Sequence, residues 1–115
     1  MFEQLKSIED RYEKLNELLS DPNIGSNPAK LREYSKEQSG IADAVTAYRK
    51  YKVVVEELKD AKEMLELESD NDMVDMVKME IEELSEQKEK LSEELEYQMD
   101  RWVYLNDIAE QMENK

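Results

Sequence analysis

Two short stretches of turn-forming residues divide this chain, and every other part of it has the hydrophobic spacing of a helix. The first stretch is DPNIGSN, residues 21–27, and the second is ESDND, residues 68–72. Outside them, apolar residues recur at steps of three and four, which places them on one face of an α-helix. The pattern therefore predicts three helices, over about residues 2–20, 28–68 and 73–113.

The residues at these interruptions indicate how each helix begins and ends. Pro22 disfavours helical geometry in Asp21 and so ends the first helix. Asn27 can accept a hydrogen bond from a free amide of the next helix, and Pro28 suits a first helical position. Asp72 is predicted to cap the third helix in the same way.

The lengths of the three segments predict an all-α fold. Two helices of about 40 residues joined by a tight turn should form a long antiparallel hairpin, a coiled coil with a narrow apolar seam. The first helix is half as long, so we expect it to widen the core into a three-helix bundle at one end. The other end, near residues 69–72, would project as a bare arm. With 115 residues, the chain is predicted to be a single helical domain spanning 1–115.

The charge of the chain restricts its partners. Asp and Glu number 30 against 16 Lys and Arg, for a formal net charge of −14. Residues 1–58 hold 11 acids and 9 bases, whereas residues 59–115 hold 19 acids and 7 bases. Any contact with nucleic acid should therefore be local and come from the first half, because the acidic half repels phosphate. DNA is not an expected partner.

The residue inventory argues against catalysis. The chain has no His and no Cys, which removes the commonest general base, the commonest metal ligand and the thiol nucleophile. Gly25 and Gly40 are isolated, so no phosphate-binding glycine loop is present. We therefore expect no catalytic, cofactor-binding or metal-binding residues and no enzyme activity. The longest aliphatic run is Val53–Val55, too short to span a membrane, and a cytoplasmic protein is expected.

One basic cluster interleaves with aromatic residues. The segment YRKYK, residues 48–52, places Arg49, Lys50 and Lys52 beside two tyrosines. These three bases are candidate contacts with RNA or with a partner. The alternative is that Tyr48 packs inward while the bases pair with the acidic third helix.

Trp102 lies in the segment DRWVYLND, where the apolar stripe of the third helix continues. Its position on that stripe, with Leu105, Ile108 and Met112 further along, favours a core residue over a binding anchor. The antiparallel register predicts that Trp102 meets Ile8 and Ile41.

Four segments, in this order, carry a resemblance to a known family: MFEQLKSIEDRYEKLNELLSDP, KLREYSKEQ, YRKYKVVVEELKDAKEMLE and DMVKMEIEEL. They resemble the N-terminal helical domain of bacterial class I peptide chain release factors, of the type that reads UAA and UAG. The resemblance covers about residues 1–95. From about residue 96 the family leaves the helix for a linker, whereas here YQMDRWVYLNDIAEQMENK continues it.

The resemblance implies a non-catalytic module of a translation termination factor. Its implied partners are the ribosome, at the stalk base of the large subunit, and the class II release factor. The family's stop-codon tripeptide and its Gly-Gly-Gln loop have no counterpart in this sequence. The alternative is a stand-alone or engineered coiled-coil scaffold, or a protein–protein interaction module without ribosomal function. In either case the exposed arm could support self-association.

Overall fold

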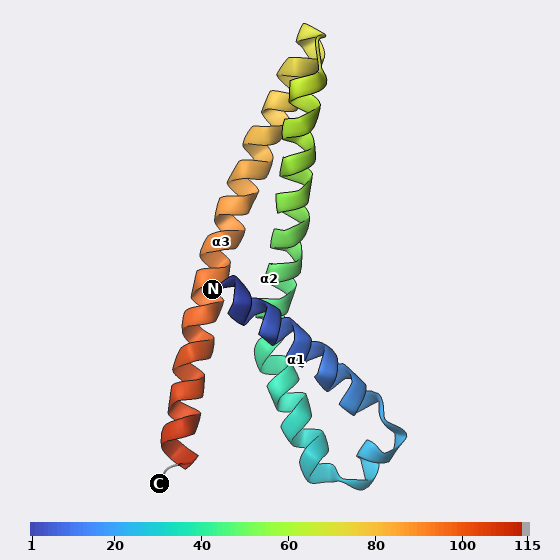
Figure 1. Cartoon of the computed structure of the whole chain (residues 1–115). Coiled ribbons are helices and arrows are strands. Elements are labelled where there is room, and N and C mark those ends of the chain that lie inside the picture. The colour runs from blue at the N-terminus through green and yellow to red at the C-terminus, as the bar shows by residue number, and fades with distance from the viewer. Residues whose placement is uncertain (114–115) are drawn as a thin grey trace. The chain divides into compact units, whose positions relative to one another are not determined.

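A computed structural model describes residues 1–113 of the chain, and in this range all regular structure is helical (Figure 1). The prediction of an all-α fold is therefore confirmed. None of the described helices is both long and apolar enough to cross a lipid bilayer. The elements are α1 (Phe2–Ser20), the 3₁₀ helix η1 (Pro22–Ser26), α2 (Pro28–Leu67) and α3 (Asn71–Glu113).

The connection between α1 and α2 contains a short 3₁₀ helix within the stretch of turn-forming residues 21–27. The Asp21 carboxylate accepts a hydrogen bond from the amide of Asn23 at 2.9 Å, which starts the short η1. The side-chain oxygen of Asn27 then accepts the amide of Lys30 at 3.2 Å. This bond confirms Asn27 as the cap of α2, with Pro28 as its first helical residue.

The predicted start of the third helix was wrong by two residues. Helix α3 begins at Asn71, and its capping group is Asp70, not Asp72. The Asp70 carboxylate accepts the amides of Asp72 at 2.9 Å and Met73 at 3.3 Å. Three acidic residues lie close together in this turn, and Asp70 is the one whose side chain reaches two free amides of the first helical turn.

The described chain forms two compact units. Unit 1 consists of Met1–Thr46 together with the chain from Glu96 onward, and unit 2 consists of Ala47–Leu95. Unit 1 therefore contains α1, η1, the first part of α2 and the last part of α3. Unit 2 contains the rest of α2 and α3, joined by the turn at residues 68–70.

The core of unit 1 is built from α1 and α2, with a contribution from α3. Leu5, Ile8 and Leu15 lie on one face of α1 and are buried. The helical spacing of these three residues explains why α1 forms, because a short helix in water depends on burying one apolar face. The other buried apolar residues of unit 1 are Ile41, Ala44, Val45 and Met99.

The core of unit 2 is a seam between the two antiparallel helices. Buried residues of α2 and of α3 form one hydrophobic cluster, and Leu65, Ile81 and Leu91 pack against it. Figure 1 shows the two helices side by side along this unit. The seam is narrow, so the flanks of both helices remain open to solvent. The cluster consists of Val54, Leu58, Ala61, Val77 and Leu84.

Candidate nucleic-acid interface

The three predicted contact residues lie on α2, in the first turns of unit 2. Arg49, Lys50 and Lys52 are all exposed. Successive residues of a helix point about 100° apart, so Arg49 and Lys52 share one side of α2 while Lys50 points away from both. The structure thus brings two of the three bases together, and Lys50 faces another direction.

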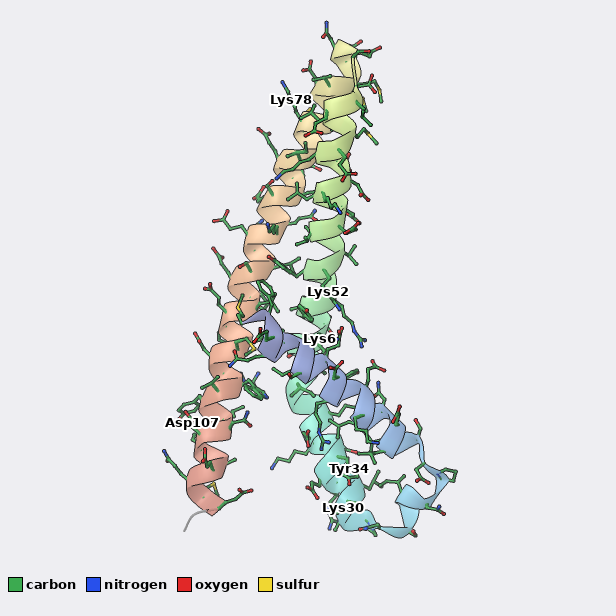
Figure 2. The ribbon with its side chains drawn as sticks, in the orientation of Figure 1. Lys6, Lys30, Tyr34, Lys52, Lys78 and Asp107 are labelled. Carbon is green, nitrogen blue, oxygen red and sulfur yellow. The ribbon has the colours of Figure 1, made fainter. Side chains whose placement is uncertain are left out.

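One tyrosine of the cluster contacts one of its bases. Tyr48 and Tyr51 are half-buried, and the Lys52 ammonium lies 4.6 Å from the centre of the Tyr48 ring. Figure 2 labels Lys52 on α2. An ammonium over an aromatic face is attracted by the ring's negative quadrupole. Arg49 and Lys52 also interact with other groups of the chain. Tyr48 is therefore neither a core residue nor a free stacking platform.

A further basic site lies along unit 2. Lys59 and Lys62 of α2 and Lys88 of α3 line a groove of about 350 Å³ that we call the lysine groove. Lys59 and Lys62 follow Lys52 at seven and ten residues, a spacing that keeps all three near one side of α2. The remaining lining residues are Val55, Leu58, Glu63 and Glu66.

Sequence reasoning missed the lysine groove for a definite reason. Lys88 belongs to the strongly acidic second half, which was expected only to repel phosphate. The antiparallel pairing of α2 and α3 places Lys88 beside Lys59 and Lys62. The charge at this groove therefore differs from the average charge of residues 59–115. The spacing of Lys52, Lys59 and Lys62 was the available signal for the part on α2.

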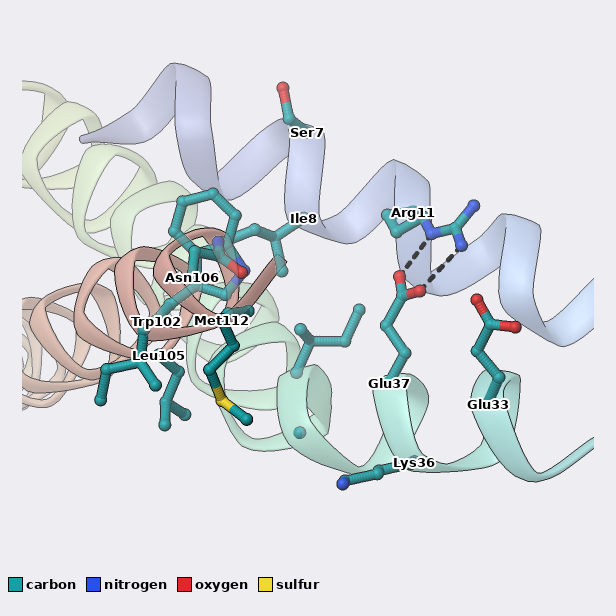
Figure 3. Close-up of a pocket in the computed structure, with 14 residues that line it drawn as sticks. Ser7, Ile8, Arg11, Glu33, Lys36, Glu37, Trp102, Leu105, Asn106 and Met112 are labelled. Carbon is teal, nitrogen blue, oxygen red and sulfur yellow. Dashed lines mark hydrogen bonds and ion pairs between the residues drawn. The ribbon is translucent and has the colours of Figure 1, made fainter. Parts of the chain in front are cut away.

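A groove of unit 1 lies between α3 and the other two helices. Its volume is about 650 Å³. Trp102 and Ile8 line it (Figure 3), and so does Ile41. The antiparallel register predicts that these three residues meet. We call it the tryptophan groove. From α3 it is also lined by Leu105, Asn106, Ile108, Ala109 and Met112.

The apolar stripe at the end of α3 is only partly buried, and Trp102 is less buried than a full core position. Trp102 is half-buried, Leu105 is 47% exposed and Met112 is 71% exposed. The facing helix surfaces explain the difference, because Ser7, Arg11, Glu33, Lys36 and Glu37 line the groove opposite the stripe. Polar and charged groups there give the stripe little apolar surface to bury against.

An ion pair between α1 and α2 forms part of this wall. The Arg11 guanidinium donates two hydrogen bonds to the Glu37 carboxylate, one of them from Nη2 to Oε1 at 2.8 Å (Figure 3). Through these hydrogen bonds, Arg11 lowers the pKa of Glu37 below its ordinary value. Beside the pair, the side chains of Gln38 and Asn16 also hydrogen-bond. Polar bonds thus fix the position of α1 on α2 beyond the apolar contact.

We expect Glu37→Gln to lower the stability of the chain at neutral pH by less than about 1 kcal/mol, because the pair is partly exposed and screened. The pKa of Glu37 is lower in the folded state, so the pair stabilises the fold above the unfolded-state pKa. This contribution is lost as pH falls through the folded-state pKa. Melting temperatures of parent and variant should therefore differ at pH 7 and converge at acidic pH, below the lowered folded-state pKa of Glu37. An equal difference at both pH values would contradict this assignment.

The grooves offer surfaces for binding. Among residues 1–113, no group of three or more acidic side chains is placed to hold a metal ion. The arrangement combines apolar walls with lysines that can contact phosphate or carboxylate groups.

Comparison with known proteins identifies the family. The family model described as PCRF domain matches residues 8–102, which extends slightly beyond the expected limit near residue 95. The chain is similar to peptide chain release factor 1 of Bacillus licheniformis, with 59% identity over 95 residues, 83% of this chain and 27% of that protein. It is similarly related to peptide chain release factor 1 of Bacillus subtilis, with 60% identity over 95 residues and the same coverage.

No solved structure gives a significant match to this chain. The chain spans about a quarter of the length of the curated relatives it matches. The family match itself covers most of the chain and agrees with the segments that carry the sequence resemblance. The chain therefore belongs to the PCRF domain family, in the branch represented by bacterial peptide chain release factor 1.

Proposed function

We propose that this chain is a non-catalytic module of a translation termination factor and that it contacts the ribosome. The identity of 59–60% to proteins named peptide chain release factor 1 supports this function. The absence of His and Cys from the sequence supports a binding role over catalysis. The stalk base of the large subunit and a class II release factor are the partners proposed from the family resemblance, and the proposed location is cytoplasmic.

We propose that Arg49, Lys50 and Lys52 form the contact with ribosomal RNA, and that the lysine groove extends it. Three observations support this assignment. The bases are exposed, two of them share one side of α2, and Lys59 and Lys62 continue along unit 2. Elsewhere the second half of the chain is strongly acidic, and a polyanion would be repelled by it.

Co-sedimentation with ribosomes at two salt concentrations tests the proposal. The parent chain should sediment with ribosomes at low salt and less at high salt, with a slope that corresponds to about three phosphate contacts. The triple variant Arg49→Glu, Lys50→Glu, Lys52→Glu should lose binding, because each reversal replaces attraction by repulsion. Circular dichroism should show unchanged helicity, since all three side chains are exposed.

A matched control separates a local contact from net charge. Lys6, Lys14 and Lys30 are exposed and lie in unit 1, and their reversal to Glu gives the same net charge as the first triple variant. The control should retain most of the binding. Equal loss in both variants would contradict the assigned contact. If the parent chain fails to sediment with ribosomes at low salt, the proposal of a ribosome-binding module is contradicted. A scaffold without ribosomal function is then favoured.

A further inference from the structure

The two flanks of unit 2 have different chemistry. Lys62 follows buried Ala61 by one residue, and Met64 precedes partly buried Leu65 by one, so the two point to opposite sides of the seam. The lysine groove lies on the side of Lys62. On the other side is a groove of about 420 Å³, which we call the methionine groove, and Val77 of the core cluster forms part of its wall. Its other lining residues are Met64, Met73, Met76, Met79, Glu80 and Glu83.

The methionines of this groove are unusually exposed. Met76 and Met79 are each 64% exposed, and Met64 and Met73 are also exposed. Exposed apolar side chains gathered in one groove mark a binding surface more often than scattered ones do. Methionine is flexible and polarizable, so a surface rich in it adapts to an apolar helix face.

The charges around the methionine groove specify what it can accept. Glu80 and Glu83 line it, and no Lys or Arg occurs among the described residues that do so. On α2, Glu57 and Asp60 precede Met64 by seven and four residues, which places them on the same face of that helix. The apolar strip is therefore bordered by carboxylates on both helices.

We propose that the methionine groove binds a basic amphipathic helix of a partner protein. The apolar face of such a helix would cover the methionines, and its Lys or Arg side chains would reach the bordering carboxylates. From Met73 to Glu83 the groove follows about 15 Å of α3, which matches about three turns of a bound helix. This proposal does not require ribosome binding, because the methionine groove shares no lining residue with the lysine groove and contains none of Arg49, Lys50 and Lys52.

Charge argues against the other occupants. Nucleic acid and anionic lipid would be repelled by the carboxylates. Unit 2 carries 16 acids and 8 bases, so a second copy of the chain would also be repelled. A cationic amphipathic helix is attracted by both features, because its apolar face packs on the methionines and its basic side chains pair with the bordering carboxylates.

Titration with synthetic peptides tests the proposal on the full chain. The probe is a helical peptide of about 14 residues, or four turns, with Leu on one face and Lys on the other. A scrambled peptide of the same composition and a peptide with Glu in place of Lys are the comparisons. Methionine methyl resonances provide the readout. Met64, Met73, Met76 and Met79 should shift with the basic amphipathic peptide, while Met1, Met99 and Met112 should not.

Two charge-reversal variants distinguish the groove from general acidity. Glu80→Lys with Glu83→Lys should weaken peptide binding by about tenfold or more, because both carboxylates line the groove. Glu82→Lys with Glu89→Lys makes the same charge change at exposed positions of α3 outside the groove, and it should weaken binding much less.

Each alternative outcome overturns the proposal. Equal binding of the scrambled peptide, or equal weakening by both double variants, would show general charge attraction. Absence of shifts at the groove methionines would show that the groove is not the site. Methionine shifts that depend on protein concentration, with a dimer in sedimentation equilibrium, would make a second copy the occupant.

Discussion

Replacing Leu15 with alanine is expected to lower the free energy of unfolding by about 2–5 kcal/mol. Leu15 is 0% exposed on the buried face of α1. The substitution removes three buried carbon atoms and leaves a cavity that the surrounding helices fill incompletely. Urea denaturation followed by circular dichroism measures the change.

The same substitution at Leu67 provides the control. Leu67 is the last residue of α2 and is 88% exposed, so Leu67→Ala should change the stability by no more than about 0.5 kcal/mol. If Leu15→Ala were as mild as Leu67→Ala, α1 would not be packed against unit 1 as the structure has it.

Replacing Leu84 with aspartate should destabilise unit 2 by at least about 4 kcal/mol at neutral pH. Leu84 belongs to the hydrophobic cluster of the seam, and the change combines a lost apolar side chain with a desolvated carboxylate. Burial raises the pKa of such a carboxyl, so its protonated form is favoured in the fold. The destabilisation should therefore shrink as pH falls through that raised pKa.

Met79→Asp is the matched variant for this experiment. Met79 lies on the same helix and is 64% exposed, so its replacement should cost far less and should show little recovery at low pH. Thermal melts at pH 7 and pH 5 compare the two variants. A Leu84→Asp variant that melts like the parent at pH 7 would refute the seam.

Local chemistry made the helices predictable. The apolar spacing marked all three α-helices, and Pro22 and the Asn27–Pro28 pair marked helix ends through local backbone geometry and side-chain capping. The cap of α3 was harder to assign, because Asp70 and Asp72 are chemically identical and two residues apart. Only the turn conformation decides which carboxylate reaches the free amides.

The candidate site was less predictable, because its composition depends on long-range register. Arg49, Lys50 and Lys52 could be recognised as a run of bases, and whether they bind RNA remains a prediction. Lys88 could be assigned to the lysine groove only once α3 was aligned with α2. For Trp102, the apolar spacing of α3 correctly predicted which face of the helix it occupies. The burial of its side chain, however, depends on the polar residues of α1 and α2 that line the groove opposite it. No sequence pattern within α3 encodes those residues.

Three lysines and two glutamates line the groove on one flank of unit 2, whereas the methionine groove on the other flank is lined by two glutamates and, among the described residues, by no lysine or arginine. The methionine groove is therefore the more negative of the two. Near a polyanion such as RNA, the helix pair should therefore turn about its long axis so that the lysine groove faces the polyanion. The methionine flank consequently faces outward, where a second macromolecule can approach. A single pair of helices can in this way select which partner meets which of its sides before any contact forms.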